Sequence, residues 1–64
     1  MAQPVTLSAN EVLELRKSRN LTQKRFGELI GENRDKISRI ELGLVKVSCE
    51  IDRKIRKVFD LPQA

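Results

Sequence analysis

The run NRDKISRIE in the middle of the chain holds several polar side chains at close spacing. If this run is helical, Ile37 and Ile40 share one face and the polar residues divide the other, because an α-helix repeats every 3.6 residues. The polar face then offers two guanidinium groups, an ammonium, a carboxylate and a hydroxyl, from Arg34, Asp35, Lys36, Ser38 and Arg39. These groups donate and accept hydrogen bonds but include no nucleophile placed beside a base. The pattern therefore indicates recognition rather than catalysis.

The rest of the composition excludes most catalytic and metal chemistry. The 64 residues include no histidine and one cysteine, so neither a histidine-based triad nor a zinc site of the usual kind can be built. No phosphate-loop pattern is present. We expect no enzyme, metal or cofactor, and no small-molecule substrate is evident. Cys49 cannot form a disulfide within the chain, and we expect it to be a small buried or half-buried apolar side chain.

The charge balance favours a polyanionic partner. Thirteen Lys and Arg against nine Asp and Glu give a net charge of +4. Between Glu14 and Glu28 there is no acid, but there are five cations: Arg16, Lys17, Arg19, Lys24 and Arg25. A second cluster near the C-terminus is more simply explained as a solvated helix face: Arg53, Lys54, Arg56 and Lys57. No apolar run approaches the ~18 residues of a membrane span, and no signal peptide precedes the fold, so we expect a cytoplasmic protein.

Start and stop signals divide the chain into short helices. Ser8, Thr22, Asn33 and Ser48 are residue types that cap helix N-termini, and each precedes an apolar pattern of helical period. Gly31 adopts the left-handed conformation that ends a helix without steric cost, and Asn20 and Gly43 suit the same role. Two of the predicted helices lie in residues 22–42 with about two residues between them. Helices so closely joined must cross steeply, which is the helix-turn-helix arrangement.

The apolar residues of these helices predict one small aliphatic core. We expect Phe26, Ile30, Ile37 and Ile40 to be buried within the motif. Val12 and Leu15 from the first helix, and Ile51, Ile55, Val58 and Phe59 from the last, form matching stripes. The predicted organisation is a flexible arm over residues 1–7, one domain over residues 8–61 and a tail over residues 62–64. The arm carries no Lys or Arg, which argues against a role in a DNA groove.

The motif resembles the phage repressor and Cro-like helix-turn-helix family, of the XRE type. The residues that carry the resemblance are Gln23, Phe26, Gly27, Ile30, Gly31, Ile37, Ser38, Arg39, Ile40, Glu41 and Gly43. In this pattern Gly27 is the small residue that lets the second motif helix approach closely. The resemblance implies an all-α domain of the lambda-repressor-like type, with four or five helices. The chain departs from the family pattern at Glu32, Val47 and Asp52.

In a helix-turn-helix domain the second motif helix lies in the major groove, so residues 33–42 would be the recognition helix. We predict that Arg34, Asp35, Lys36, Ser38 and Arg39 read base edges. The two arginines suit guanine O6 and N7. Asp35 could accept from cytosine N4, or could instead support Arg39 by an ion pair four residues along the helix. We expect Glu41 to cap or pair within the protein rather than to contact DNA.

The start of the first motif helix suits the DNA backbone, because free N–H groups and the positive end of the helix dipole lie there. The resemblance implies that Gln23 binds a phosphate there. The full set of predicted phosphate-binding residues is Gln23, Thr22, Lys24, Arg25, Asn33, Arg16 and Lys46. Both phenylalanines fall on buried stripes, which argues against a stacking platform for single-stranded nucleic acid.

These features predict a sequence-specific regulator of transcription that binds double-stranded DNA, most simply a repressor or Cro-like protein in the cytoplasm, at the nucleoid. One small domain has a limited footprint, so we expect a homodimer on a palindromic operator. The resemblance places the dimer surface near Val58, Phe59 and Leu61. The alternative is a DNA-binding antitoxin or a protein-interaction module whose main partner is another protein, such as a toxin or polymerase.

Overall fold

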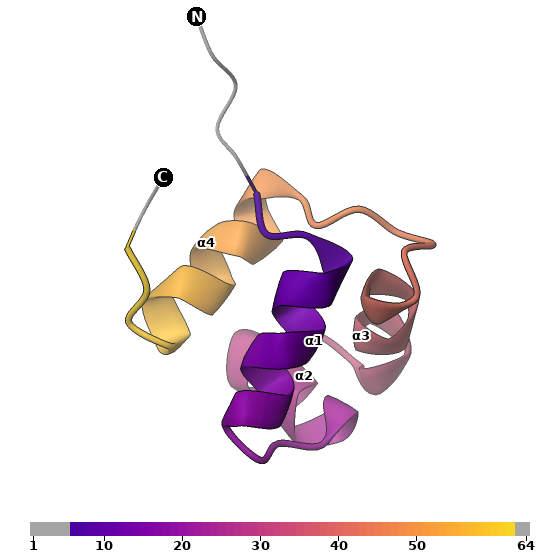
Figure 1. Ribbon diagram of the computed structural model, residues 1–64, viewed down its shortest axis with the longest axis horizontal. Coiled ribbons are helices and arrows are strands. Elements are labelled where there is room, and N and C mark those ends of the chain that lie inside the picture. The colour runs from indigo at the N-terminus through magenta and orange to yellow at the C-terminus, as the bar shows by residue number, and fades with distance from the viewer. Residues whose placement is uncertain (1–5, 63–64) are drawn as a thin grey trace, which may run out of the picture.

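The computed structural model describes residues 6–62, and Figure 1 shows the order of its helices. The helices are α1 (Ala9–Ser18), α2 (Gln23–Ile30), α3 (Arg34–Glu41) and α4 (Cys49–Val58). Within residues 6–62 there is no strand and no fifth helix, so the prediction of an all-α domain is confirmed. No helix in this part of the chain is long and apolar enough to cross a membrane. Most of the predicted arm, and the last two residues of the predicted tail, lie outside the described residues.

Each helix begins at the residue that the sequence predicts. The side-chain oxygens of Ser8, Thr22, Asn33 and Ser48 each accept a hydrogen bond from the backbone N–H three residues further on, at 2.8–3.2 Å. Glu11 in turn accepts from the Ser8 N–H at 3.0 Å, which completes a capping box. The caps satisfy donors that a helix leaves free at its start. They explain why such short helices begin at defined positions.

Loss of one cap should destabilise the domain by a modest amount. Ser48 caps α4, and its hydroxyl accepts from the Ile51 N–H at 3.2 Å. We expect Ser48→Ala to lower the free energy of unfolding by about 1 kcal/mol, because that N–H loses its partner. In a domain of this size the midpoint of thermal unfolding should fall by roughly 4–8 °C. A melting curve followed by circular dichroism tests this, and an unchanged midpoint would contradict the assigned cap.

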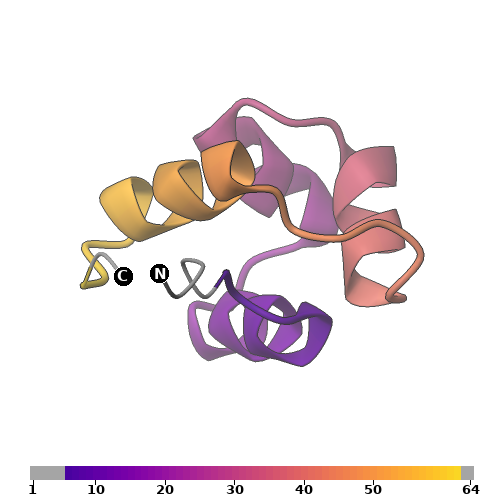
Figure 2. The ribbon, with the colours of Figure 1, turned by 90° about the horizontal axis from the view of Figure 1, so that it is seen from above.

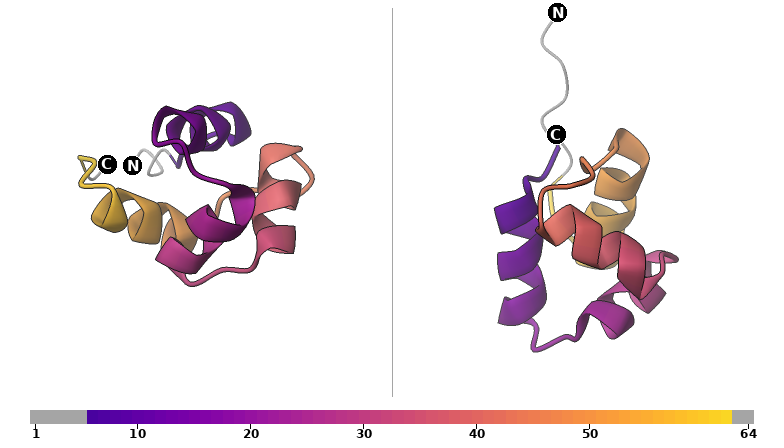
Figure 3. Two further views of the ribbon diagram at one scale, coloured as in Figure 1. Left: turned by 90° about the horizontal axis from the view of Figure 1, so that it is seen from below. Right: turned by 90° about the vertical axis from the view of Figure 1, so that its right-hand side faces the viewer.

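The helices surround one small core. Figures 2 and 3 show α1 on one side of the molecule, α2 and α4 across from it, and α3 closing one end. The buried side chains come from all four helices and from the α3–α4 connection: Val12, Phe26, Ile30, Ile37, Ile40, Val47, Ile51 and Ile55. Phe59 stacks on Phe26 with ring centroids 5.3 Å apart. The predicted motif core is therefore confirmed.

Three predictions about the last helix need correction. Val58 is 44% exposed although it lies on the same helical stripe as Ile51 and Ile55, because it is the last residue of α4. Cys49 is exposed rather than half-buried, because it is the first residue of α4 and lies off the same stripe. The basic cluster on α4 is not uniformly solvated, since Arg56 pairs with the buried Asp52 at 2.9 Å. Gly27 meets the expectation of a close approach: a Cβ there would lie 2.5 Å from the Glu32 oxygen and 3.3 Å from the carbonyl of Asn33, the N-cap of α3.

The three departures from the family pattern are all accommodated locally. Val47 is buried in the core. Asp52 is 7% exposed, and its carboxylate accepts from the Leu7 N–H and from Arg56 Nε, both at 2.9 Å. Glu32 pairs with Lys54 at 3.3 Å, which connects the motif turn to α4. Asp52 therefore fixes both the segment before α1 and the orientation of α4.

Candidate nucleic-acid interface

The predicted recognition helix, α3, has one buried face and one polar face. Ile37 and Ile40 have no exposed surface, so they fix the rotation of the helix about its axis. The five predicted base readers lie on the remaining surface: Arg34, Asp35 and Arg39 are exposed, and Lys36 and Ser38 are half-buried. A shallow hollow over the start of the helix is lined by Asn33, Arg34, Asp35 and Ser38. Three of the predicted readers, Arg34, Asp35 and Ser38, therefore gather over the start of α3, and Arg39 lies in its last turn.

Asp35 and Arg39 form an ion pair, with Arg39 Nη2 3.1 Å from Asp35 Oδ2. Both side chains are more than half exposed, so the pair adds little stability, but it orients the guanidinium. This contact is the support for Arg39 that the four-residue spacing predicts. Whether Asp35 also accepts from cytosine stays a prediction.

The start of α2 brings predicted phosphate-binding residues together with Arg34, a predicted base reader. A second hollow, between this helix start and α3, is lined by Arg16, Thr22, Gln23, Lys24 and Arg34. Thr22 caps α2, so the N–H groups of the first turn are directed outward at this point. Cations beside a helix N-terminus form an environment that favours an anion. The three remaining candidates lie outside this hollow: Asn33 lines the first hollow, Arg25 is exposed and 3.6 Å from Glu28, and Lys46 is exposed after α3.

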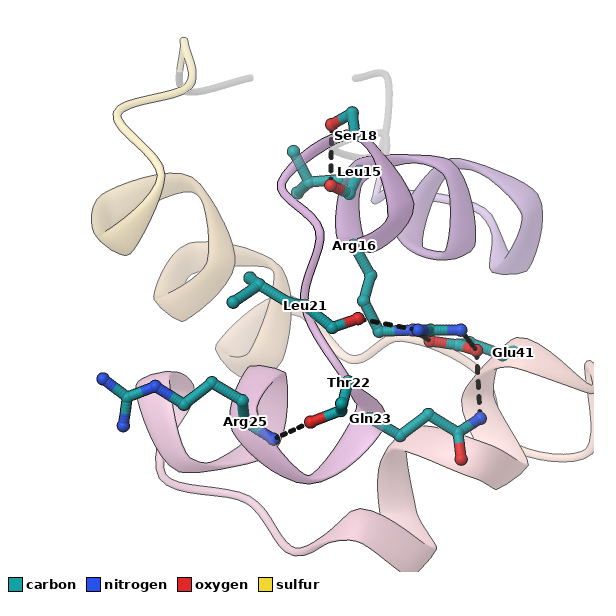
Figure 4. Close-up of polar contacts among 8 residues, drawn as sticks. All are labelled: Leu15, Arg16, Ser18, Leu21, Thr22, Gln23, Arg25 and Glu41. Carbon is teal, nitrogen blue, oxygen red and sulfur yellow. Dashed lines mark hydrogen bonds and ion pairs between the residues drawn. The ribbon is translucent and has the colours of Figure 1, made fainter.

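A buried polar network lies behind this surface, where α1, α2 and α3 meet (Figure 4). Arg16 on α1 donates from Nε and Nη2 to the two carboxylate oxygens of Glu41, at 2.7 and 3.0 Å. Its Nη1 donates to the Leu21 carbonyl at 2.8 Å. Gln23, the first residue of α2, donates from Nε2 to Glu41 Oε1 at 3.1 Å. The side chains of Arg16 and Glu41 are only 15% and 6% exposed.

This network changes how two residues are interpreted. The expectation that Glu41 pairs within the protein is confirmed. The phosphate contact predicted for Arg16 is untested, but three of its nitrogens already donate within the protein. We therefore assign Arg16 to the support of the interface. Sequence reasoning missed the Arg16–Glu41 pair because 25 residues separate the partners. The sequence offered one weak signal for this pair. Arg16 directly follows Leu15, and Glu41 directly follows Ile40, so both come next to residues that face the core.

The geometry defines a class of protein. Two short helices cross at a tight turn, as Figure 3 shows. The second presents a polar outer face, and the first begins at a capped, cationic turn. This is the arrangement of helix-turn-helix DNA-binding domains.

A family model described as helix-turn-helix matches residues 12–62, and the chain belongs to that family, the Cro/C1-type helix-turn-helix proteins. The family is one of DNA-binding transcription regulators and not of enzymes. Searches of curated proteins and of solved structures found no match.

Proposed function

We propose that this regulator is a repressor or Cro-like protein that reads a specific double-stranded DNA site with α3 in the major groove. The observation that carries the proposal is the polar face of α3, whose opposite face is fixed by two fully buried isoleucines. The outward side chains are thereby held in one direction. Arg34 and Arg39 would each donate two hydrogen bonds to guanine O6 and N7. Asp35, Lys36 and Ser38 complete the reading surface.

The contacts to the DNA backbone come from the start of α2 and from flanking cations. Thr22, Gln23 and Lys24 line the hollow between α2 and α3, beside Arg34. Arg25, Asn33 and Lys46 lie on exposed surface around it. Each phosphate that a cation neutralises should contribute about −0.9 to the slope of log affinity against log salt concentration. These residues position the domain on DNA without reading its sequence.

We further propose that two copies bind one palindromic operator. A single module contacts few base pairs, and two-fold related copies read half-sites about one helical turn apart. Phe59 and Leu61 pack partly against the core, so only part of their area is free for a second copy. The large apolar side chains most exposed within residues 6–62 are Leu42 (70%), Leu44 (73%) and Val58 (44%). We expect a contact between two copies to bury these three side chains.

Selection from a random duplex library at physiological salt tests the proposal. We expect enrichment of an inverted repeat whose half-site centres are about 10 base pairs apart. Enrichment of a single short site would support sequence-specific binding but contradict the proposed dimer. No enrichment, with binding that only falls steeply with salt, would remove the sequence-specific function.

Arg39→Ala should relax the preference at one base-pair position in each half-site. Loss of a bidentate contact to guanine costs about 1–3 kcal/mol of discrimination. Repeating the library selection with the variant measures this directly. Arg53→Ala is the matched control, because it removes the same charge from an exposed position on α4. If Arg39→Ala keeps the base preference of the wild type, as Arg53→Ala is expected to do, Arg39 is not a reader.

A second candidate function is a DNA-binding antitoxin or interaction module whose main partner is another protein. The exposed Leu42 and Leu44, which follow α3 directly, are the observation that favours it. Such a complex would persist at salt concentrations that release DNA, because apolar contacts are not screened by ions. Substituting both leucines with serine should then abolish the protein complex and leave DNA affinity unchanged.

A further inference from the structure

Glu41 stands where the three helices of the buried network meet. It is the last residue of α3, and its carboxylate accepts two hydrogen bonds from Arg16 and one from Gln23. An ionised carboxylate accepts only, whereas a glutamine amide both donates and accepts. Glu41 therefore requires the Gln23 amide to turn its nitrogen inward and its oxygen away. Figure 4 shows this orientation, with the Gln23 carbonyl oxygen on the side away from Glu41.

The fixed amide has a consequence for anion binding. Phosphate oxygens also accept only, so Gln23 must present an N–H, not its carbonyl oxygen, to a DNA backbone. One amide hydrogen is held by Glu41, and the second is left on the same nitrogen for an outside acceptor. A glutamine without this anchor would sample several rotamers and both amide orientations, and would lose that freedom on binding. Because the contact with Glu41 already restricts the Gln23 side chain in the free protein, little conformational entropy remains to be lost on binding DNA.

We propose that Glu41 is a positioning residue for DNA binding, which acts by holding the Gln23 amide ready for a phosphate. It does not touch DNA itself, since its side chain is 6% exposed and faces Arg16. Arg16 fixes the carboxylate in place through the two parallel bonds of its guanidinium. The inference rests on the proposed function and deepens it. It links the end of the recognition helix to the backbone contact at the start of α2.

A double-mutant cycle separates this role from a structural one. We would measure affinity for a mixed-sequence duplex at low salt with the wild type, Gln23→Ala, Glu41→Gln and the double variant. Loss of one charge-assisted hydrogen bond should weaken binding roughly tenfold in Gln23→Ala. If Glu41 acts through Gln23, Glu41→Gln should weaken the wild type but cause no further loss in Gln23→Ala. Equal losses in both backgrounds would overturn the proposal, because independent effects multiply.

Charge and folding need their own controls. Glu41→Gln raises the net charge, which by itself strengthens binding to DNA. Glu28→Gln makes the same change on α2, at a side chain that is 53% exposed and outside the network, and sets the baseline. Circular dichroism establishes that each variant is folded. If wild-type protein binds no duplex, the proposed function fails together with this inference; additive losses with normal wild-type binding overturn the inference alone.

If Glu41→Gln does not fold, the wild type still supplies a test. In ¹⁵N-labelled protein, one hydrogen of the Gln23 side-chain amide should exchange slowly with water, and the other should exchange quickly. The resonance pair is assigned by its loss in Gln23→Ala. On addition of duplex DNA the fast hydrogen should shift. Equal, fast exchange of both hydrogens, as in free glutamine, would overturn the proposal.

Discussion

Replacing Gly27 with valine is expected to unfold or strongly destabilise the domain. A Cβ atom at this position would lie 2.5 Å from the backbone oxygen of Glu32 and 3.3 Å from the carbonyl carbon and oxygen of Asn33. These are backbone atoms of the motif turn, and the turn is held there, since the Glu32 N–H donates to the Gly27 carbonyl at 2.8 Å. The turn cannot retreat without losing that bond and shifting α3.

The energetic consequence follows from the size of the domain. Over-packing a tight site costs about 1–3 kcal/mol, and valine adds two further methyl groups to the clash. Small domains have total stabilities at the lower end of roughly 5–15 kcal/mol. Circular dichroism and thermal melting measure the result. A cooperative transition at the wild-type temperature would contradict the assigned contact between Gly27 and the turn.

Gly27→Ala tests the same contact, because its effect on stability should have the opposite sign to that of the same substitution elsewhere in a helix. In an ordinary helix interior, glycine to alanine stabilises by about 1 kcal/mol. At Gly27 the clash with the turn should reverse this, and the variant should melt below the wild type. Gly43→Ala is the matched control: its φ is 78° but no heavy atom lies within 4 Å of the added carbon. That variant should show only the ~1–2 kcal/mol of backbone strain.

The sequence predicted those parts of the fold whose causes are local. A cap acts on an N–H three residues away, and a left-handed glycine on its own helix end, so Ser8, Thr22, Asn33 and Gly31 could be assigned from short patterns. The buried side of α3 could be assigned for the same reason, since Ile37 and Ile40 are three residues apart. Patterns of this range determined where the helices begin and which faces they bury.

The contacts between distant residues could not be assigned in this way. Nothing in the order of residues pairs Arg16 with Glu41, or Asp52 with the Leu7 N–H 45 positions earlier. Arg16 was expected to meet phosphate because it belongs to a cluster of five cations beside the motif. Gln23 was expected at the DNA backbone by resemblance, but its partner Glu41 depends on the crossing of two helices. These pairings appear only once the helices are packed.

The second large effect is expected from Arg16→Met. Methionine keeps much of the arginine stem but leaves the Glu41 carboxylate, 6% exposed, with Gln23 as its remaining described partner. Breaking a buried ion pair from one side costs about 3–5 kcal/mol, because the remaining charge stays out of water. Thermal melting should show a large loss of stability. Lys17→Met on the same helix is the control, since Lys17 is exposed and its loss should have little effect.

The double variant Arg16→Met, Glu41→Met separates stability from function. Replacing both members of a buried ion pair with apolar side chains of similar volume is often neutral or stabilising. We therefore expect the double variant to melt well above Arg16→Met and near the wild type. Its DNA affinity should not recover with its stability, because Gln23 has lost the carboxylate that orients its amide. Recovery of both would mean that the network only holds α1 to α3, and that Gln23 binds phosphate without it.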